Sequence, residues 1–330
     1  KSVSLNIGGS RVDTIYGEWL DIYSELTSTI DEKKTANILN GNNVELHTPE
    51  NAPGQNGVYP HIVSGDQHTR FDNTGFNIEV ISNVSSTGNT IPSIIGNTYR
   101  VPLPFWFSGK NGLALPLIAL QYQAVELEVT LAPLYELYTA LEVDSGNTGF
   151  GKRVIPSTSN ESRLGIDKFV IDQTFVNSRN INLQLESTYV FLDDAERKRF
   201  SVYEHEYLIT QHQKNINNVI NYSNSSLKVD LEFNLPVKTL YWTLQNREAQ
   251  KMNRWYDFSL NPQRLQLNKL LEPLKSVEMK INGQDRFSER DAEHFRLVEP
   301  YNFSNIIPEK FMYTYNFGLN PNQIKYECQL

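Results

Sequence analysis

Cysteine is nearly absent from this chain. Cys328 is the one cysteine among 330 residues, so no disulfide can form within the chain. A protein without disulfides suits a reducing compartment. Cys328 lies in an alternating apolar run that reaches Leu330, and this position predicts a buried thiol that packs as a small apolar side chain. Apolar burial disfavours the thiolate, which argues against a reactive nucleophile.

Long hydrophobic runs are missing as well. The longest, at residues 113–120, is interrupted by Pro116 and is far shorter than the ~20 residues that a membrane-spanning helix needs. The first residues show no signal-peptide pattern. We therefore expect no membrane span.

An excess of basic charge is also lacking, since 30 Lys and Arg face 38 Asp and Glu and the net charge is −8. Neutralising nucleic-acid phosphates takes clustered Lys and Arg, so we expect no direct contact with nucleic acid. Apolar residues make up 39% of the chain and charged residues 21%, which is typical of a globular protein. The length suits two domains.

Motifs for catalysis and metal binding are missing too. The sequence has no HExxH motif, no Cys/His cluster and no GxSxG elbow. The six histidines are His47, His61, His68, His205, His212 and His294. His205, Glu206 and His212 come closest to a cupin-like metal site. However, His205 and Glu206 are neighbours on an expected strand and point to opposite faces, which opposes shared coordination. We predict no catalytic, cofactor-binding or metal-binding residue.

Two distant stretches of the chain are nearly the same. Residues 2–9 read SVSLNIGG and residues 276–283 read SVEMKING, and in both stretches apolar and polar residues alternate. Alternation predicts a strand with one buried face. Gly8-Gly9 and Asn282-Gly283 can adopt the positive φ of tight hairpin turns. Each copy precedes a segment with an aromatic residue near a glutamate, so a repeated unit and two similar β domains are predicted.

The remaining pattern indicates many short strands and little helix. Further strands are predicted at 105–107, 125–131, 168–176, 181–191, 205–213, 226–235, 239–245 and 311–319. Helical spacing predicts a short helix at 16–26, and the charged segment 192–200 also has helical propensity. Residues 31–97 and 140–166 are polar and are interpreted as exposed loops, the first as a long loop insertion. The prediction is an all-β protein with two sandwiches or barrels.

Three surface features have more than one interpretation. The charged run at 193–199 is a solvated linker with local ion pairs, which we favour, or an inter-subunit contact. The aromatic run at 105–107 favours a core strand over a sugar-stacking surface. The five Asn-X-Ser sequons are Asn83, Asn160, Asn221, Asn224 and Asn302. Such sequons arise from composition alone in a chain rich in Asn and Ser, and we do not expect secretory glycosylation.

Several longer segments carry a family resemblance. They are VPLPFWFSGKNGLALPLIALQYQAVEL at 101–127, YVFLDDAERKRF at 189–200, HEYLITQHQ at 205–213, LEFNLPVKTLYW at 231–242 and INGQDRFSERDAEHFRLVEPY at 281–301. In this order they resemble the major capsid proteins of large icosahedral DNA viruses, the nucleocytoplasmic lineage with chlorovirus-like and iridovirus-like members. The resemblance covers most of the chain outside the loops.

The resemblance implies a double jelly roll, two tandem jelly-roll sandwiches that divide the chain near Asp193–Phe200 into residues 1–196 and 197–330. It implies a homotrimeric capsomer without enzymatic activity, located in the virion shell and assembled inside the host cell. Its partners would be neighbouring capsomers and the minor capsid and penton proteins. Because the family has further strands before residue 2 and after residue 330, we also expect both rolls to be incomplete here.

One alternative from another class stays open. A two-domain β-sandwich protein that binds or hydrolyses carbohydrate would share the architecture. It would show a concave site with exposed aromatic residues and paired carboxylates or bound Ca²⁺, whereas the shell protein would form a stable trimer without a metal.

Overall fold

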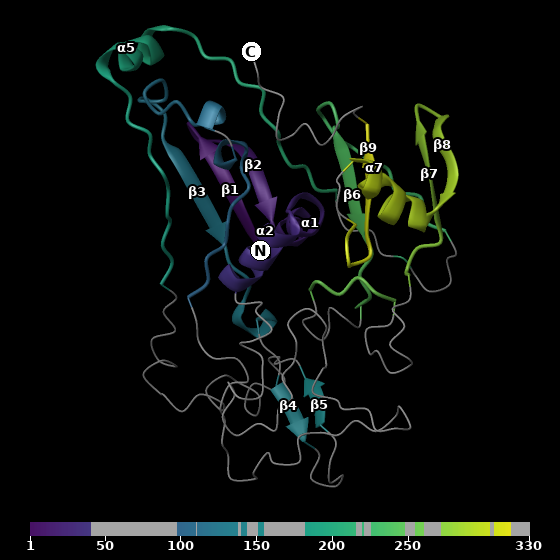
Figure 1. Cartoon of the computed structure of the whole chain (residues 1–330). Helices are drawn as coiled ribbons and strands as arrows, with labels where there is room; N and C mark the ends of the chain where they lie inside the picture. Colours follow the sequence, from purple (N-terminus) through teal and green to yellow (C-terminus); the bar gives the residue numbers. More distant parts are fainter. Residues whose placement is uncertain are drawn as a thin grey trace.

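The structure is a computed structural model of the whole chain (Figure 1). It describes residues 1–40, 98–109, 111–137, 140–143, 151–154, 182–215, 220, 226–247, 255–260, 272–303 and 307–317. The predictions for residues 168–176 and 324–330, including Cys328, lie outside these ranges. The described strands form one three-stranded and three two-stranded sheets.

The first repeat is a β-hairpin. Strands β1 (Ser2–Ile7) and β2 (Ser10–Tyr16) pair antiparallel, and β3 (Val125–Thr130) pairs with the other edge of β1. Gly8 and Gly9 connect β1 and β2 with φ of 57° and 77°. Positive φ at both turn positions matches the right-handed twist of the strands, which is why this two-residue connection needs glycine.

The second repeat has the same construction. Strands β7 (Ser276–Ile281) and β8 (Gln284–Asp291) pair antiparallel. The turn residues Asn282 and Gly283 have φ of 52° and 80°. Asparagine tolerates the left-handed conformation better than most residues, so it substitutes for the first glycine. The predicted repeat is therefore confirmed as a hairpin with the same turn.

The two hairpins also share an irregularity that the sequence does not reveal. In the first hairpin, the pairing shifts after Leu5 and leaves Val12 as an extra residue. In the second, the pairing shifts after Met279 and leaves Arg286 as an extra residue, and it shifts a second time between Val277 and Met279. Val12 and Arg286 lie 274 residues apart, the same offset that relates the two turns. A bulge of this kind redirects the following side chain. Its recurrence supports duplication, and superposition of the complete sandwiches stays a prediction.

A helix follows each hairpin. Helix α1 (Gly17–Thr27) extends from β2, and the π-helix η7 (His294–Val298) after β8 leads into α7 (Glu299–Phe303). The aromatic residue predicted after each copy lies in these helices, as Trp19 and Phe295. The helix expected at residues 16–26 is confirmed.

The prediction of a loop from residue 31 is wrong at its start. Residues Ile30–Leu39 form helix α2. Thr29 accepts a hydrogen bond from the Glu32 amide, and the Glu32 carboxylate accepts one from the Thr29 amide. This capping box initiates a helix even in a polar segment with little apolar periodicity. The rest of the expected insertion, from residue 41 to 97, lies outside the described residues.

The second loop prediction, at 140–166, is also wrong in part. Strands β4 (Ala140–Val143) and β5 (Gly151–Val154) pair antiparallel within it.

The remaining described elements are η3 (Trp106–Ser108), η4 (Asn111–Leu113), η5 (Leu134–Glu136), α5 (Asp194–Val202), β6 (Thr239–Thr243) and β9 (Met312–Asn316). β6 pairs with β9, so the strands expected around 239–245 and 311–319 are confirmed, as are the helix near 192–200 and the strand near 125–131.

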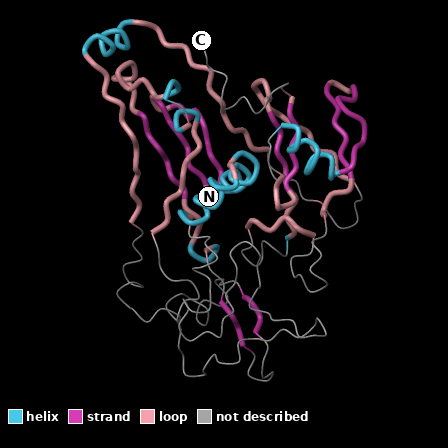
Figure 2. Tube along the Cα trace, in the orientation of Figure 1, coloured by secondary structure: helices cyan, strands magenta, loops and turns pink. Residues whose placement is uncertain are grey.

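Four strand predictions fail. The described parts of 181–191, 205–213 and 226–235 contain no strand, and Figure 2 draws them as loop. Alternation reports which side chains are apolar, but a strand also needs a neighbouring backbone to pair with. Many of these apolar side chains are exposed, and Phe191 is 94% exposed. At 105–107 Phe105 is buried, but it precedes the 3₁₀ helix η3, so a core residue is confirmed and a strand is not.

Apolar side chains gather in three clusters. In the first repeat they include Leu5, Ile15 and Phe105; in the second they include Phe287, Ala292, Phe295 and Tyr313. The third cluster joins Ile22 and Leu26 of α1 to Phe258 and Met312. Helix α1 lies between the two sets of strands in Figure 1. It follows the first repeat in the sequence, but it packs against residues of the second half.

We predict that Gly9→Ala lowers the free energy of unfolding by about 1–2 kcal/mol, the cost of a left-handed conformation for a residue with a Cβ. A Cβ on Gly9 would meet no atom within 4 Å, so backbone strain alone is tested. Gly109→Ala is the matched control, because Gly109 has equal space and a right-handed φ of −96°. Urea unfolding measures both variants. Equal stability of the two would contradict the assigned turn.

Candidate functional site

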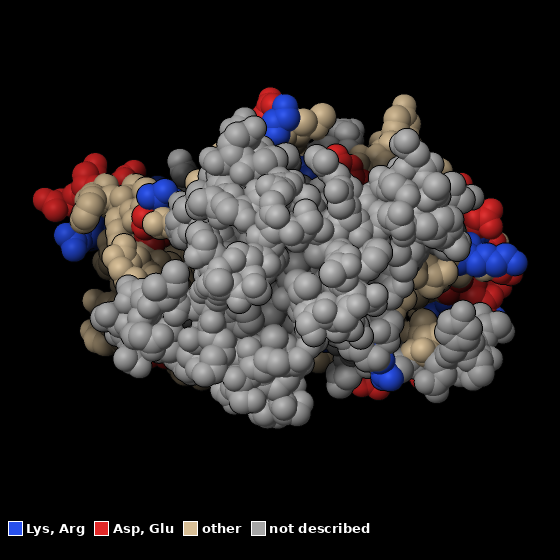
Figure 3. All heavy atoms as spheres, turned by 90° about the horizontal axis from the view of Figure 1, so that it is seen from below, with Lys and Arg blue, Asp and Glu red and all other residues tan. Residues whose placement is uncertain are grey.

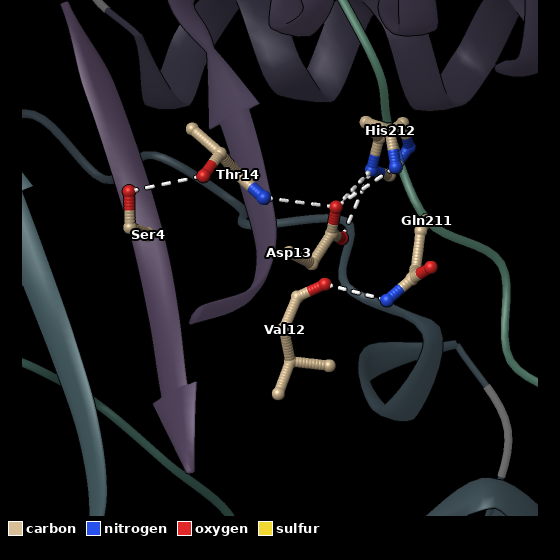
Figure 4. A network of polar contacts seen from close by, with 6 residues as sticks. All are labelled: Ser4, Val12, Asp13, Thr14, Gln211 and His212. Carbon is tan, nitrogen blue, oxygen red and sulfur yellow. Dashed lines mark hydrogen bonds and ion pairs between the residues drawn. The ribbon is translucent and has the colours of Figure 1, made fainter. Parts of the chain in front are cut away.

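The best-formed polar site among the described residues is centred on Asp13 of β2 (Figure 4). The Asp13 side chain is fully buried. Its Oδ1 accepts hydrogen bonds from the backbone amides of His212, at 2.8 Å, and Thr14, at 2.9 Å. The His212 Nδ1 lies 3.0 Å from Asp13 Oδ2. A buried carboxylate is tolerated when it accepts several such bonds, so this residue attaches a distant segment to the first hairpin.

The bulge explains why a carboxylate points inward at this position. Asp13 directly follows the extra residue Val12, whose carbonyl accepts a hydrogen bond of 2.6 Å from the Gln211 amide side chain. The equivalent position in the second repeat is Phe287, which is buried in an aromatic cluster. The first repeat thus has a polar attachment point where the second has an apolar core residue.

Trp19 of α1 extends this contact toward the second half of the chain. Its ring lies 4.8 Å from the His212 ring and 5.1 Å from the ring of Tyr241 on β6, centroid to centroid. Burial raises the pKa of the Tyr241 hydroxyl to about 12. Tyr241 therefore stays neutral at physiological pH and packs as an aromatic residue.

Ion pairs hold the other side of α1. The Lys310 ammonium pairs with the Asp21 carboxylate and lies 5.4 Å from the centroid of the Tyr256 ring. Burial raises the pKa of the Asp21 carboxyl more than Lys310 lowers it. The Lys33 ammonium lies 3.0 Å from Glu25 Oε2. These pairs fix the position of α1, because breaking one would leave a buried charge uncompensated.

A broad groove lies along these residues. It has a volume of about 5250 Å³ and is lined by α1, α2, the segments 101–106 and 207–215, and β6, among other described residues. Small-molecule sites typically enclose roughly 300–1,000 Å³. The groove is therefore several times larger than a typical small-molecule site.

The structure separates the histidines considered for a metal site. The His205 Nε2 lies 2.8 Å from the Phe200 carbonyl oxygen, and its ring stacks on the Phe200 ring. His212 pairs with Asp13, and Glu206 is exposed. No group of three His, Cys, Asp or Glu residues among the described positions is placed to hold a metal ion. The absence of metal, catalytic and cofactor residues stays a prediction.

The charged segment at 193–199 forms the exposed helix α5, which stands at the outer end of a long excursion in Figure 1. The Asp193 Oδ1 caps the helix by accepting a hydrogen bond of 2.8 Å from the Glu196 amide. Val202 and Tyr203 at its end are 71% and 67% exposed. Both interpretations, solvated linker and inter-subunit contact, remain compatible with this position.

The other sequence features have separate outcomes. Asn302 is exposed on α7, while the other four sequons and three of the histidines (His47, His61 and His68) lie outside the described residues. No helix in the described part of the chain is long and apolar enough to cross a membrane. Around the edge of the view in Figure 3, described acidic and basic side chains lie beside one another.

Sequence reasoning missed the residues that join the two halves, namely Asp13, Asp21 and Lys310. Each is an ordinary charged residue, and its partner lies 199 or 289 positions away. The one sign of a buried charge in the sequence is that Asp13 occurs within a segment that otherwise alternates like a strand. That signal is hidden because the bulge displaces the alternation of inward and outward positions.

We predict that Asp13→Ala lowers the free energy of unfolding by about 3 kcal/mol, because buried donors lose their acceptor. Asp13→Asn should cost less, since its carbonyl oxygen can still accept the His212 amide. Asp230→Ala is the control: Asp230 is 75% exposed in its ion pair with Lys228, and its loss should cost roughly 0.5 kcal/mol. Urea unfolding monitored by tryptophan fluorescence provides the comparison. A cost for Asp13→Ala no larger than that of the control would contradict the anchoring role.

Comparisons with known proteins relate the whole chain to one family. The model for the major capsid protein N-terminus matches residues 1–193, and the model for the large eukaryotic DNA virus major capsid protein matches residues 196–330. The major capsid protein of Pyramimonas orientalis virus is 27% identical over 93% of this chain and 54% of its own length. Capsid protein 1 of Acanthamoeba polyphaga mimivirus is 34% identical over 73% of this chain and 31% of its own length.

Comparison with solved structures supports the predicted fold. The crystal structure of PBCV-1 VP54, fitted into a reconstruction of the virophage Sputnik, has a TM-score of 0.56 and 22% identity over 97% of this chain and 64% of that chain. This likeness shows the predicted fold, an all-β double jelly roll. The chain spans about half the length of the first of these relatives. With both family models matched in order, the chain belongs to the major capsid protein family of large eukaryotic DNA viruses.

Proposed function

We propose that this chain is the shell-forming part of a major capsid subunit, and that three copies form a capsomer in the facets of an icosahedral virion. One observation carries the proposal: two family models for this class of protein match consecutive halves of the chain, residues 1–193 and 196–330. We accordingly propose that the chain resides in the capsid shell after assembly in the interior of the host cell.

The two halves are proposed to be separate jelly rolls, at residues 1–196 and 197–330. The repeated hairpin, with the same turn and an equivalent bulge in each half, supports this division. The boundary falls in α5, which is exposed and contributes no residue to the three buried clusters.

The proposed role is structural and involves no catalysis. Two carboxylates among the described residues join distant segments of the chain: Asp13 holds His212, and Asp21 holds Lys310. Rigid blocks suit a shell, since each subunit must present the same contact surfaces to its neighbours. A carbohydrate-binding or hydrolytic protein would instead direct aromatic and carboxylate groups into a cleft, whereas Trp19 packs against His212 and Tyr241.

Exposed surfaces at α5 and beside it are the proposed contact region for neighbouring subunits and capsomers. The flanking segments expose Val190 at 67% and Phe191 at 94%, and the helix carries charges of both signs. Apolar groups surrounded by mixed charge are typical of protein interfaces. Minor capsid and penton proteins are the further partners proposed for the shell.

The proposal predicts a mass of three chains for the purified protein, measured by size-exclusion chromatography with light scattering. An obligate trimer buries several thousand Å² and stays associated at micromolar concentration. Phe191→Asp should shift the mass toward one chain, because it places a charge on an exposed apolar side chain of the proposed contact region. Tyr122→Asp is the matched control, since Tyr122 is 91% exposed and distant from α5 in sequence. A monodisperse monomer would count against the capsomer proposal.

A further inference from the structure

The end of the second hairpin holds a histidine between two groups of opposite charge. The Arg290 Nη1 of β8 lies 2.8 Å from His294 Nε2. The Glu299 Oε1 of α7 lies 3.5 Å from the same nitrogen. His294 begins the π-helix η7, and a π-helical turn is rare and often marks a functional position.

The two contacts demand opposite states of one nitrogen. A guanidinium can only donate hydrogen bonds, so Arg290 requires an unprotonated Nε2 with its lone pair free. A carboxylate can only accept, so Glu299 requires an Nε2 that carries a proton. His294 can therefore satisfy Arg290 when it is neutral or Glu299 when it is charged, but not both at once.

We propose that His294 is a proton-operated switch between β8 and α7. In the neutral state Nδ1 carries the proton and Nε2 accepts from Arg290. When a proton binds to Nε2, the imidazolium is repelled by Arg290 and attracted to Glu299, so the link to β8 is replaced by one to α7. The inference is independent of the proposed shell function.

The change of partner at His294 affects the fold because Glu299 and the neighbouring Phe295 are buried. Glu299 is 7% exposed, and its Oε2 is buried without a hydrogen-bond partner in the described part of the chain. A proton on His294 would compensate this carboxylate. The next residue, Phe295, is fully buried in the core of the second repeat. A change of partner at His294 therefore acts on the segment that positions a core side chain.

The His294 ring is accessible to protons from the solvent. His294 is 26% exposed and borders a shallow pocket of about 470 Å³ with Arg290 and Leu297. The other titratable or charged groups on the elements packed around it are Asp291 of β8, Glu293 and Arg296 beside or on η7, and Tyr313 and Tyr315 of β9. Arg296 is held by Glu272 through two hydrogen bonds of 3.0 and 3.2 Å.

The test is a histidine-selective NMR titration of the full chain from pH 5 to 8, in which His294→Gln assigns the signal. Arg290→Gln should raise the midpoint of the His294 titration, because it removes the group that favours neutral imidazole. Glu299→Gln should lower it, because it removes the group that favours the charged form. Each shift should be at least about 0.5 pH unit. Lys280→Gln and Glu278→Gln, at exposed positions on the same hairpin, remove equal charges as controls.

Opposite shifts that exceed the controls are the required result, since a merely structural role would not produce them. Circular dichroism confirms that each variant is folded before titration. Shifts in the same direction, shifts no larger than those of the controls, or a His294 signal that does not titrate in this range would overturn the switch.

Discussion

The burial of α1 between the two repeats is the constraint on which the rest of the structure depends. Its apolar face places Ile22 and Leu26 against Phe258 and Met312, which belong to the second half of the chain. Burying side chains of this size contributes roughly 1.5–3 kcal/mol each. Because α1 continues directly from β2, the first hairpin cannot move relative to the second half without exposing this cluster. The two halves therefore share this one cluster, while each also has a cluster of its own.

Polar groups around α1 determine how the halves meet, since apolar packing alone permits sliding. Asp13 binds His212 on one side, and Asp21 binds Lys310 on the other. Each pair is buried enough that an alternative arrangement would leave a charge without a partner, which costs several kcal/mol. Such pairs add little net stability, but they select one geometry. A shell subunit benefits from that selection, because its contact surfaces must be positioned alike in every copy.

The two repeats share one backbone arrangement, but the side chains at equivalent positions have different roles. Both hairpins have the same positive-φ turn and the same bulge. After the bulge the first repeat places Asp13, which binds a distant segment, while the second places Phe287, which packs against Phe295. The polar chemistry of the second repeat lies instead at the end of β8, around His294. A duplicated fold thus carries a different charged site in each copy.

The sequence by itself determined several local elements and the class of protein. Alternation and turn residues are short-range properties, so the hairpins ending in Gly8-Gly9 and Asn282-Gly283, the helix around Trp19 and the strand β9 were predictable. Family resemblance along 101–127 and 281–301 predicted the double jelly roll. Only the tertiary structure decided which apolar runs pair: the segment with Phe191 alternates like a strand but has no strand assignment. It also decided that Asp13 is buried, because contacts across 199 residues leave no periodic trace. Local propensity acts over a few residues, whereas pairing and charge burial depend on partners that the chain brings together only on folding.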